Sequence, residues 1–171
     1  MTGQTDSERA GLIGLARKLI EYWALLGGLV LVALVLMSTW SVTSSAILGA
    51  PVPGDFEMVE VGVAIAAFSF LPYCQLTGAN VSADIFTAKA SRQTVAFLQA
   101  LSAIIAFGFS LILLWRMNAG MSDYQEYLET TAILSFPIWM AFVPILISLG
   151  LLAIAAAITV GESLRHLAGA R

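Results

Sequence analysis

Residues 22–48 read YWALLGGLVLVALVLMSTWSVTSSAIL, an apolar run without a charged residue. A helix needs about 20 residues to cross the ~30 Å hydrocarbon core of a bilayer, so this run is long enough to span a membrane and to tilt or protrude. Its length also predicts a span that is retained rather than cleaved as a signal peptide. This stretch therefore indicates an integral membrane protein.

Working outward from this run, three more apolar segments reach the length of a span. They lie at about residues 58–76, 94–115 and 131–160. The sequence therefore predicts an all-α integral membrane protein with four transmembrane helices. Neither an internal repeat nor a low-complexity stretch divides the chain, so residues 1–171 are interpreted as a single compact membrane domain.

The overall composition supports this class and argues against others. Hydrophobic residues make up 59% of the chain and charged residues only 11%, too few to cover a soluble domain of this size. A net charge of −3 offers no basic footprint for nucleic acid. The chain has one cysteine, Cys74, and one histidine, His166. These are too few for an intrachain disulfide, a cysteine-based metal cluster or a haem held by two histidines.

The distribution of basic residues predicts the orientation in the membrane. Basic residues near spans stay on the cytoplasmic side, and seven of the eight agree with one topology. They precede the first span, lie between the second and third, or follow the fourth; Arg116 is the exception. Both termini are therefore expected in the cytoplasm, with the 49–57 and 118–130 loops outside.

Short amphipathic segments are predicted between the spans, at about 11–21, 80–92 and 122–129. The first has apolar residues at helical spacing and charges on other faces, which suggests a helix on the inner membrane surface. The second is expected to be a similar cytoplasmic helix. In the third, Ser122 and Gln125 have the spacing of a capping box, which predicts a short helix at the outer interface.

Ionisable residues inside spans usually mark sites, and Glu60 is the one candidate here. With Glu57 it forms an i, i+3 pair near the start of span two, and Arg116 at the outer end of span three is a possible partner. A structural or subunit-facing ion pair, solvated carboxylates at headgroup level, and an ion-pathway role all fit this pattern. No phosphate loop, zinc motif or catalytic triad is apparent.

Three prolines fall within or beside the apolar segments. Pro72 and Pro144 each remove a backbone donor inside a span, which predicts kinks rather than an ion site. Pro137 is expected in an early turn of span four, where a missing donor matters least. Small residues one turn apart, such as Ala24 with Gly28 and Gly62 with Ala66, give the helices faces suited to close packing.

Three stretches of the sequence, taken in order, match motifs of one known family. The first is 53–60, PGDFEMVE, a proline followed by acids that open span two. The second joins 70–75, FLPYCQ, with 78–85, GANVSADI, and resembles the family's "H-V-x-V-D" surface segment. The third is 134–139, LSFPIW, with Pro144, and resembles the "L-x-I-P-x-W" entry to the last span. In these stretches the chain resembles the small membrane subunit (DctQ-like) of tripartite ATP-independent periplasmic (TRAP) transporters.

The resemblance implies a scaffold in the bacterial inner membrane. It would pair with a large elevator-type subunit that holds the substrate and sodium sites, while a periplasmic binding protein delivers an organic acid. No catalytic, substrate-binding, metal or cofactor residues are expected in this chain. Asn80 stands where many members have histidine, and Ser41–Ser45 replaces an arginine often found near the end of span one. Residues expected to serve the subunit interface or the structure are Glu57, Glu60, Asn80, Asp84, Arg116, Pro137 and Trp139.

Acidic residues gather on the expected outer side. Asp123, Glu126 and Glu129, with Glu57 and Glu60, are predicted to form a face that meets the binding protein, although simple topology would also leave acids outside. The alternative function is a self-sufficient homodimeric exporter of the small multidrug resistance type, which needs a carboxylate deep in the membrane, and span one has none. A membrane anchor of an oxidoreductase is a third possibility, against which His166 outside the spans argues.

Overall fold

The structure, a computed structural model, describes residues 2–78 and 92–169. These residues form helices α1 (Thr2–Leu48), α2 (Asp55–Thr77), α4 (Arg92–Glu126) and α5 (Trp139–Gly169). Each helix contains a segment long and apolar enough to cross a membrane. The prediction of an all-α protein with four membrane-spanning helices is therefore confirmed.

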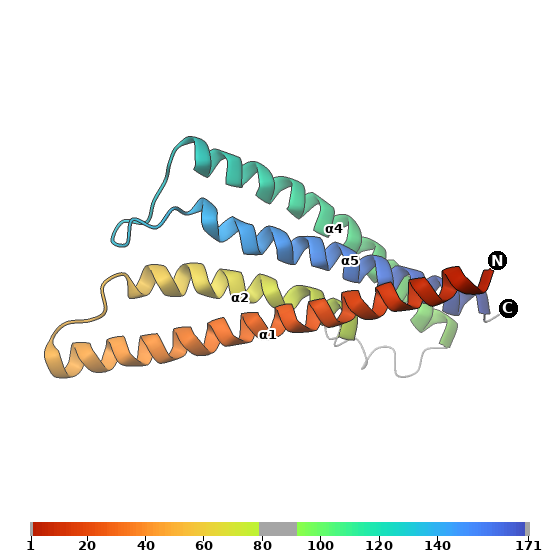
Figure 1. The fold of residues 1–171 in the computed structure, drawn as a ribbon, viewed down its shortest axis with the longest axis horizontal. Coiled ribbons are helices and arrows are strands. Elements are labelled where there is room, and N and C mark those ends of the chain that lie inside the picture. Colours follow the sequence, from red (N-terminus) through yellow and green to blue (C-terminus); the bar gives the residue numbers. More distant parts are fainter. Residues whose placement is uncertain (1, 79–91, 170–171) are drawn as a thin grey trace.

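The four helices spread apart at one end of the molecule, in the order α1, α2, α5, α4, and converge at the other end, where α1 crosses α5 (Figure 1). α2 packs against α1 and α5, whereas α4 packs against α5. The N and C termini lie at one end, called here the terminal end, and the connections 49–54 and 127–138 lie at the other, called the loop end. Consecutive spans therefore run in opposite directions, but the helices do not close into a compact bundle.

Helix α5 lies at the centre of the hydrophobic contacts. Its buried residues Ile145, Leu149 and Leu152 form a core cluster, and Leu149 is fully buried. Partly buried side chains of α2 and α4 pack against this cluster from both sides: Ala64, Phe68, Leu71, Leu113, Leu114 and Met117. Because α5 fills the space between α2 and α4, those two helices contribute to one core without extensive direct contact.

Small residues bring α1 and α2 close together. A Cβ atom added to Gly27 would lie 2.7 Å from the Cβ of Ser69, and one added to Gly62 would meet the side chain of Leu34 at 2.7 Å. Residues Gly27 and Gly62 therefore let two backbones approach more closely than larger residues would allow. The expectation of small-residue packing holds here, with Gly27 rather than Gly28 at the tightest point.

Three helix boundaries differ from the prediction. The amphipathic segment 11–21 is not a separate helix, because α1 continues through it without a break. No proline interrupts it, and the packed face continues through the fully buried Ile20. Helix α4 runs on to Glu126, so Ser122 lies inside it and donates to the carbonyl of Asn118 at 3.2 Å instead of forming a capping box.

Helix α5 begins later than expected. Residues 131–138 form a loop, and Pro137 precedes the first helical residue instead of lying in an early turn. An isolated bridge between Thr130 and Pro137 closes this loop. Pro72 and Pro144 lie inside α2 and α5, and both helices continue through them.

Candidate functional site

The most elaborate polar contact at the loop end is made by Glu57, in the first turn of α2. Its Oε1 accepts a hydrogen bond from the Ile133 amide at 2.7 Å, and its Oε2 accepts one from the Leu134 amide at 3.0 Å. Two adjacent amides that point at one carboxylate form a small anion-binding concavity. Glu57 thereby ties α2 to the connection between α4 and α5.

The loop that Glu57 holds is closed by its own hydrogen bonds. The Thr131 amide donates to the Phe136 carbonyl at 3.0 Å, and the Phe136 amide donates to the Thr131 hydroxyl at 3.0 Å. Ser135, whose amide donates to the Thr131 carbonyl, takes a positive φ of 53°. This compact conformation turns consecutive amides at 133 and 134 toward Glu57. We call residues 131–136 with Glu57 the loop clasp.

Gly54 lies directly against Leu134 of the loop clasp. It caps α2 with a φ of 75°, a conformation that favours glycine. A Cβ atom built on Gly54 would lie 2.5 Å from Cγ of Leu134. The absence of a side chain therefore serves both the backbone conformation and the close approach of the loop.

A second polar junction joins α1 to the start of α2. The buried Ser41 donates from its hydroxyl to Oδ2 of Asp55 at 2.5 Å and accepts from the Val52 amide at 3.1 Å. Ser41 belongs to the polar run 41–45. In this chain the Ser41 hydroxyl fixes the 49–54 turn.

Polar contacts also connect α1 and α5 toward the terminal end. The indole Nε1 of Trp23 donates to the buried Ser148 hydroxyl at 2.8 Å, and that hydroxyl donates to the Pro144 carbonyl at 2.8 Å. Closer to the terminal end, Arg17 and Glu162 form an ion pair with a 2.6 Å separation, and each side chain is almost half exposed. α1 is thus anchored to α5 as well as to α2.

The structure does not join Glu60 to Arg116. Both residues are exposed and no ion pair links them, because α5 lies between α2 and α4. The structure therefore does not bring Arg116 to Glu60, and a subunit-facing role for either residue stays a prediction. Glu57 and Glu60, paired by their spacing in the sequence, have different surroundings. Glu57 bonds to amides of the loop clasp, whereas Glu60 is exposed at the surface.

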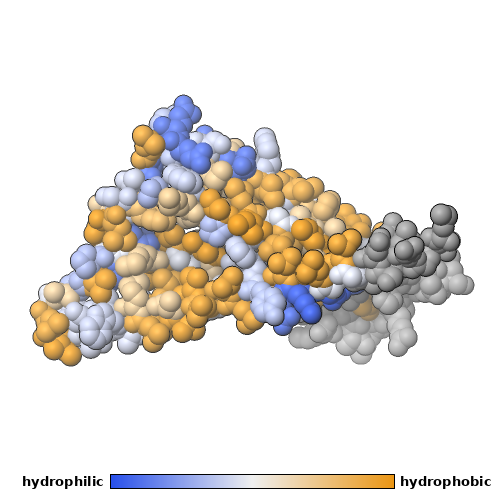
Figure 2. Space-filling view, viewed as in Figure 1, coloured by the Kyte–Doolittle hydropathy of each residue, from blue (hydrophilic) through white to orange (hydrophobic). Residues whose placement is uncertain are grey.

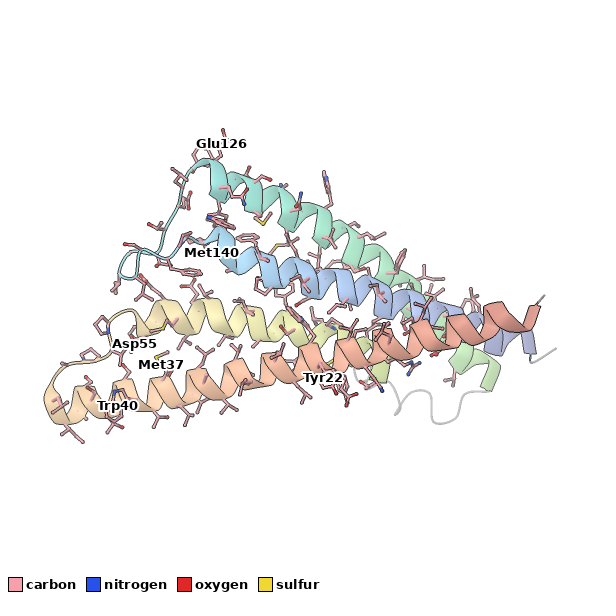
Figure 3. The ribbon with its side chains drawn as sticks, viewed as in Figure 1. Tyr22, Met37, Trp40, Asp55, Glu126 and Met140 are labelled. Carbon is pink, nitrogen blue, oxygen red and sulfur yellow. The ribbon has the colours of Figure 1, made fainter. Side chains whose placement is uncertain are left out.

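The three acids predicted to meet the binding protein are exposed at the loop end. Asp123 and Glu126 lie in the last turn of α4, and Glu129 follows in the loop. Figure 2 shows hydrophilic side chains gathered at the end of α4, and Figure 3 shows Glu126 directed away from the helices. Pro137 and Trp139 lie at the junction of the loop with α5, where both are partly buried. Asn80 and Asp84 lie outside the described residues.

Within residues 2–78 and 92–169 the structure offers no group of three ligating side chains that could hold a metal ion. Buried side-chain nitrogen and oxygen atoms in this part of the chain all have hydrogen-bond partners. Buried serines, for example, bond to carbonyls of their own helices, as Ser69 does to Ile65 at 2.8 Å and Ser110 to Phe107 at 2.7 Å. The polar groups of these spans are therefore used internally.

Sequence reasoning did not identify Ser148 or Glu162. Ser148 is a single hydroxyl in an apolar run, and its only signal is a position one turn after Pro144. Glu162 lies at the end of the last span and has no feature that distinguishes it from a solvated acid. Their partners on α1 are 125 and 145 residues away, so only the fold brings them together.

Comparison with known proteins adds one finding. The model of the family described as "Tripartite ATP-independent periplasmic transporters, DctQ component" matches residues 34–166, which is most of the chain. The matched region begins within α1 and extends into the last turns of α5. Among curated proteins none matches this chain significantly.

Proposed function

Because the chain belongs to the DctQ component family of tripartite ATP-independent periplasmic transporters, we propose that it is a scaffold on which a large elevator-type membrane subunit moves. The family comprises non-catalytic subunits of the inner membrane, so this chain is a multi-pass transporter subunit and not an enzyme. The proposed cargo is an organic acid. A sodium gradient would drive its uptake, and a periplasmic binding protein would deliver it.

The observation that supports a scaffold role best is the open arrangement of the helices. Because the helices spread apart toward the loop end, much of their surface is exposed, and α1 and α4 carry many exposed large apolar side chains. Such an arrangement has ample surface for a membrane partner and for lipid. It has little interior in which an organic acid could be enclosed.

The internal use of polar groups points the same way. A carboxylate or a sodium ion needs several polar groups to replace its water. In the described spans the buried polar side chains are already bonded within the chain. The proposal therefore assigns the substrate and sodium sites to the large subunit and expects no cofactor in this chain.

The orientation is part of the proposal. Arg17 and Lys18 lie at the terminal end of α1, together with the termini themselves. Because basic residues are retained in the cytoplasm, the terminal end is proposed to be cytoplasmic. The loop end, with the acids of α4, then faces the periplasm.

Reconstitution in liposomes tests the scaffold proposal. With an inward sodium gradient, the chain alone is expected to accumulate no organic acid. The chain with its large subunit and binding protein is expected to accumulate it. Uptake or proton-coupled export by the chain alone would contradict the proposal and favour the homodimeric exporter.

The binding protein is proposed to dock at the exposed acids of the loop end. Reversing two charges, Glu126→Lys with Glu129→Lys, should raise the concentration of binding protein that gives half-maximal uptake. The effect should be larger at low salt, since salt screens exposed charges. The matched control is Glu21→Lys at the terminal end, which should leave this concentration unchanged. An unchanged concentration in the double variant, with normal assembly, would make the acids a by-product of topology.

A further inference from the structure

Arg116 is a cation on an exposed side of α4, and it pairs with no acid of the described residues. In this part of the chain the ion pair is that of Arg17 with Glu162, and no side-chain hydrogen bond involves Arg116. Helix α5 separates Arg116 from Glu60, and Asp123, the next acid along α4, follows two turns later. The guanidinium is therefore free to bind an anion from outside the described chain.

The position of Arg116 along α4 is apolar. Leu113, Leu114 and Met117, on other sides of the same helical turn, pack against the core cluster of α5. Helix α4 then continues past Arg116 for about 15 Å before it ends at Glu126. Arg116 thus belongs to the membrane-spanning part of α4, toward its loop end. Charged side chains in spans are rare and are normally paired.

An exposed apolar surface leads from Arg116 along α4 toward the terminal end. Ile112, Phe109 and Ile105 precede Arg116 at helical spacing, and at about 100° per residue all three lie within about 40° of its direction. Their side chains are 58–63% exposed, because α4 packs extensively only against α5 among the described helices. We call Ile105, Phe109 and Ile112 the α4 lane.

The α4 lane and Arg116 together have the dimensions of one phospholipid in a single leaflet. From Ile105 to Arg116 the helix rises about 16 Å, close to half of a ~30 Å hydrocarbon core. An acyl chain that lies along the lane would bring the lipid phosphate to the level of Arg116. The planar guanidinium can bind a phosphate through two N–H donors at once.

Trp115 supports this placement of the headgroup. It is next to Arg116 and is 73% exposed, and tryptophan rings are enriched at the boundary between hydrocarbon and water. An acidic side chain of another protein could also neutralise Arg116, but such a pair would not require an exposed apolar lane of acyl-chain length beside it. The combination of cation and lane therefore favours a lipid.

We propose that Arg116 and the α4 lane form a binding site for one phospholipid of the leaflet at the loop end, with the guanidinium on the lipid phosphate. The inference depends on the chain lying in a membrane and not on the proposed transport role. A bound phosphate would neutralise the one basic residue that departs from the predicted cytoplasmic distribution. It would also fix the depth of α4, the helix that packs against a single neighbour.

Native mass spectrometry of the full chain in detergent tests the site. The probes are phosphatidylglycerol and a phosphate-free lipid with the same acyl chains, digalactosyl diacylglycerol. Arg116→Gln should raise the dissociation constant of phosphatidylglycerol at least about tenfold, because it removes a charged, bidentate contact. Arg116→Lys keeps the charge without the planar fork and should raise it less. The galactolipid should bind more weakly, and neither variant should change its binding.

Lys18→Gln is the matched control, because it removes an equal charge at an exposed position near the terminal end. It should change the dissociation constant less than about twofold. A second pair tests the lane: Ile112→Ser should weaken binding about threefold or more, whereas Ile104→Ser, exposed but about 120° away around the helix, should not.

Three results would overturn the lipid site. The first is an equal effect of Arg116→Gln and Lys18→Gln, and the second is equal affinity for the two lipids. The third is an Arg116→Gln variant that binds phosphatidylglycerol normally but loses a co-expressed large subunit during purification, which would assign Arg116 to a protein acid instead. A weaker phospholipid affinity in Arg116→Gln and Ile112→Ser, with both controls normal, would support the site.

Discussion

Replacing Gly54 by alanine is expected to destabilise the protein through two separable effects. The first is conformational, because a φ of 75° lies in the left-handed region, which costs a residue with a Cβ about 1–2 kcal/mol. The second is steric, because the new Cβ would lie 2.5 Å from Cγ of Leu134 and 2.9 Å from both of its Cδ atoms. Forcing such overlaps apart costs about 1–3 kcal/mol.

The loop has little freedom to retreat from the new methyl group. The amide of Leu134 is held by Glu57 at 3.0 Å, and the loop is closed by the bonds of Thr131. The expected total for Gly54→Ala is therefore about 2–5 kcal/mol.

Gly49→Ala is the matched control, because Gly49 has a φ of 68° and no atoms within 4 Å of its virtual Cβ. It should cost only the conformational share, about 1–2 kcal/mol. Thermal unfolding of the purified protein in detergent gives the comparison. At about 2–4 °C per kcal/mol, Gly54→Ala should melt about 2–12 °C below Gly49→Ala.

A double variant isolates the steric effect. Leu134→Ala removes the atoms that the Gly54 methyl group would meet, so Gly54→Ala should cost less in that background than in the unmodified chain. The coupling between the two changes should be about 1–3 kcal/mol. Equal melting temperatures for Gly49→Ala and Gly54→Ala, or no recovery with Leu134→Ala, would refute the reasoning.

Three further changes probe the polar contacts. Glu57→Gln should speed hydrogen exchange at the Ile133 and Leu134 amides, because hydrogen bonds to a charged carboxylate are stronger than those to a neutral amide. Glu60→Gln, at an exposed position, should leave the exchange of these amides unchanged. Equal exchange rates in the two variants would contradict the loop clasp. Trp23→Phe should lower the melting temperature by about 1–3 °C, since a side-chain hydrogen bond between membrane helices contributes about 0.6 kcal/mol on average. An unchanged melting temperature would show that the Trp23 hydrogen bond does not stabilise the contact between α1 and α5. Glu162→Gln should change the free energy of unfolding by less than about 1 kcal/mol, because its ion pair with Arg17 is partly exposed to solvent. A larger loss of stability in the same melting assay would contradict this and show that the ion pair is shielded from water.

The number and order of the helices could be predicted from sequence because hydrophobic runs of sufficient length have few alternatives in a membrane protein. The end of α4 was missed since residues 117–126 include the polar, loop-like Asn118, Ser122 and Asp123. The structure keeps this segment helical by packing it on α5. The ring centroids of Tyr124 and Phe142 are 5.2 Å apart, and the missing side chain at Gly120 leaves space for the Phe142 ring.

The site was harder to predict than the helices. The sequence singled out Glu57 as part of an i, i+3 pair with Glu60, three residues away. Its observed partners are amides 76 and 77 residues away, and they face it because of a local turn that includes a positive φ at Ser135. Periodicity shows which residues share a helix face but not which helices are neighbours, so the arrangement with α5 between α2 and α4 was also not foreseen.

The location of the polar contacts explains how this open arrangement of helices keeps its register. Apolar side chains between membrane helices give little directional preference, because lipid is as apolar as they are. In this chain Glu57 and Ser41 fix α2 to its neighbours at the loop end, and Arg17 and Trp23 fix α1 to α5 toward the terminal end. Sliding any helix of these pairs by one turn, about 5.4 Å, would break a contact at one end or the other. Helices held at both ends present a fixed apolar surface, which is what the proposed scaffold role requires.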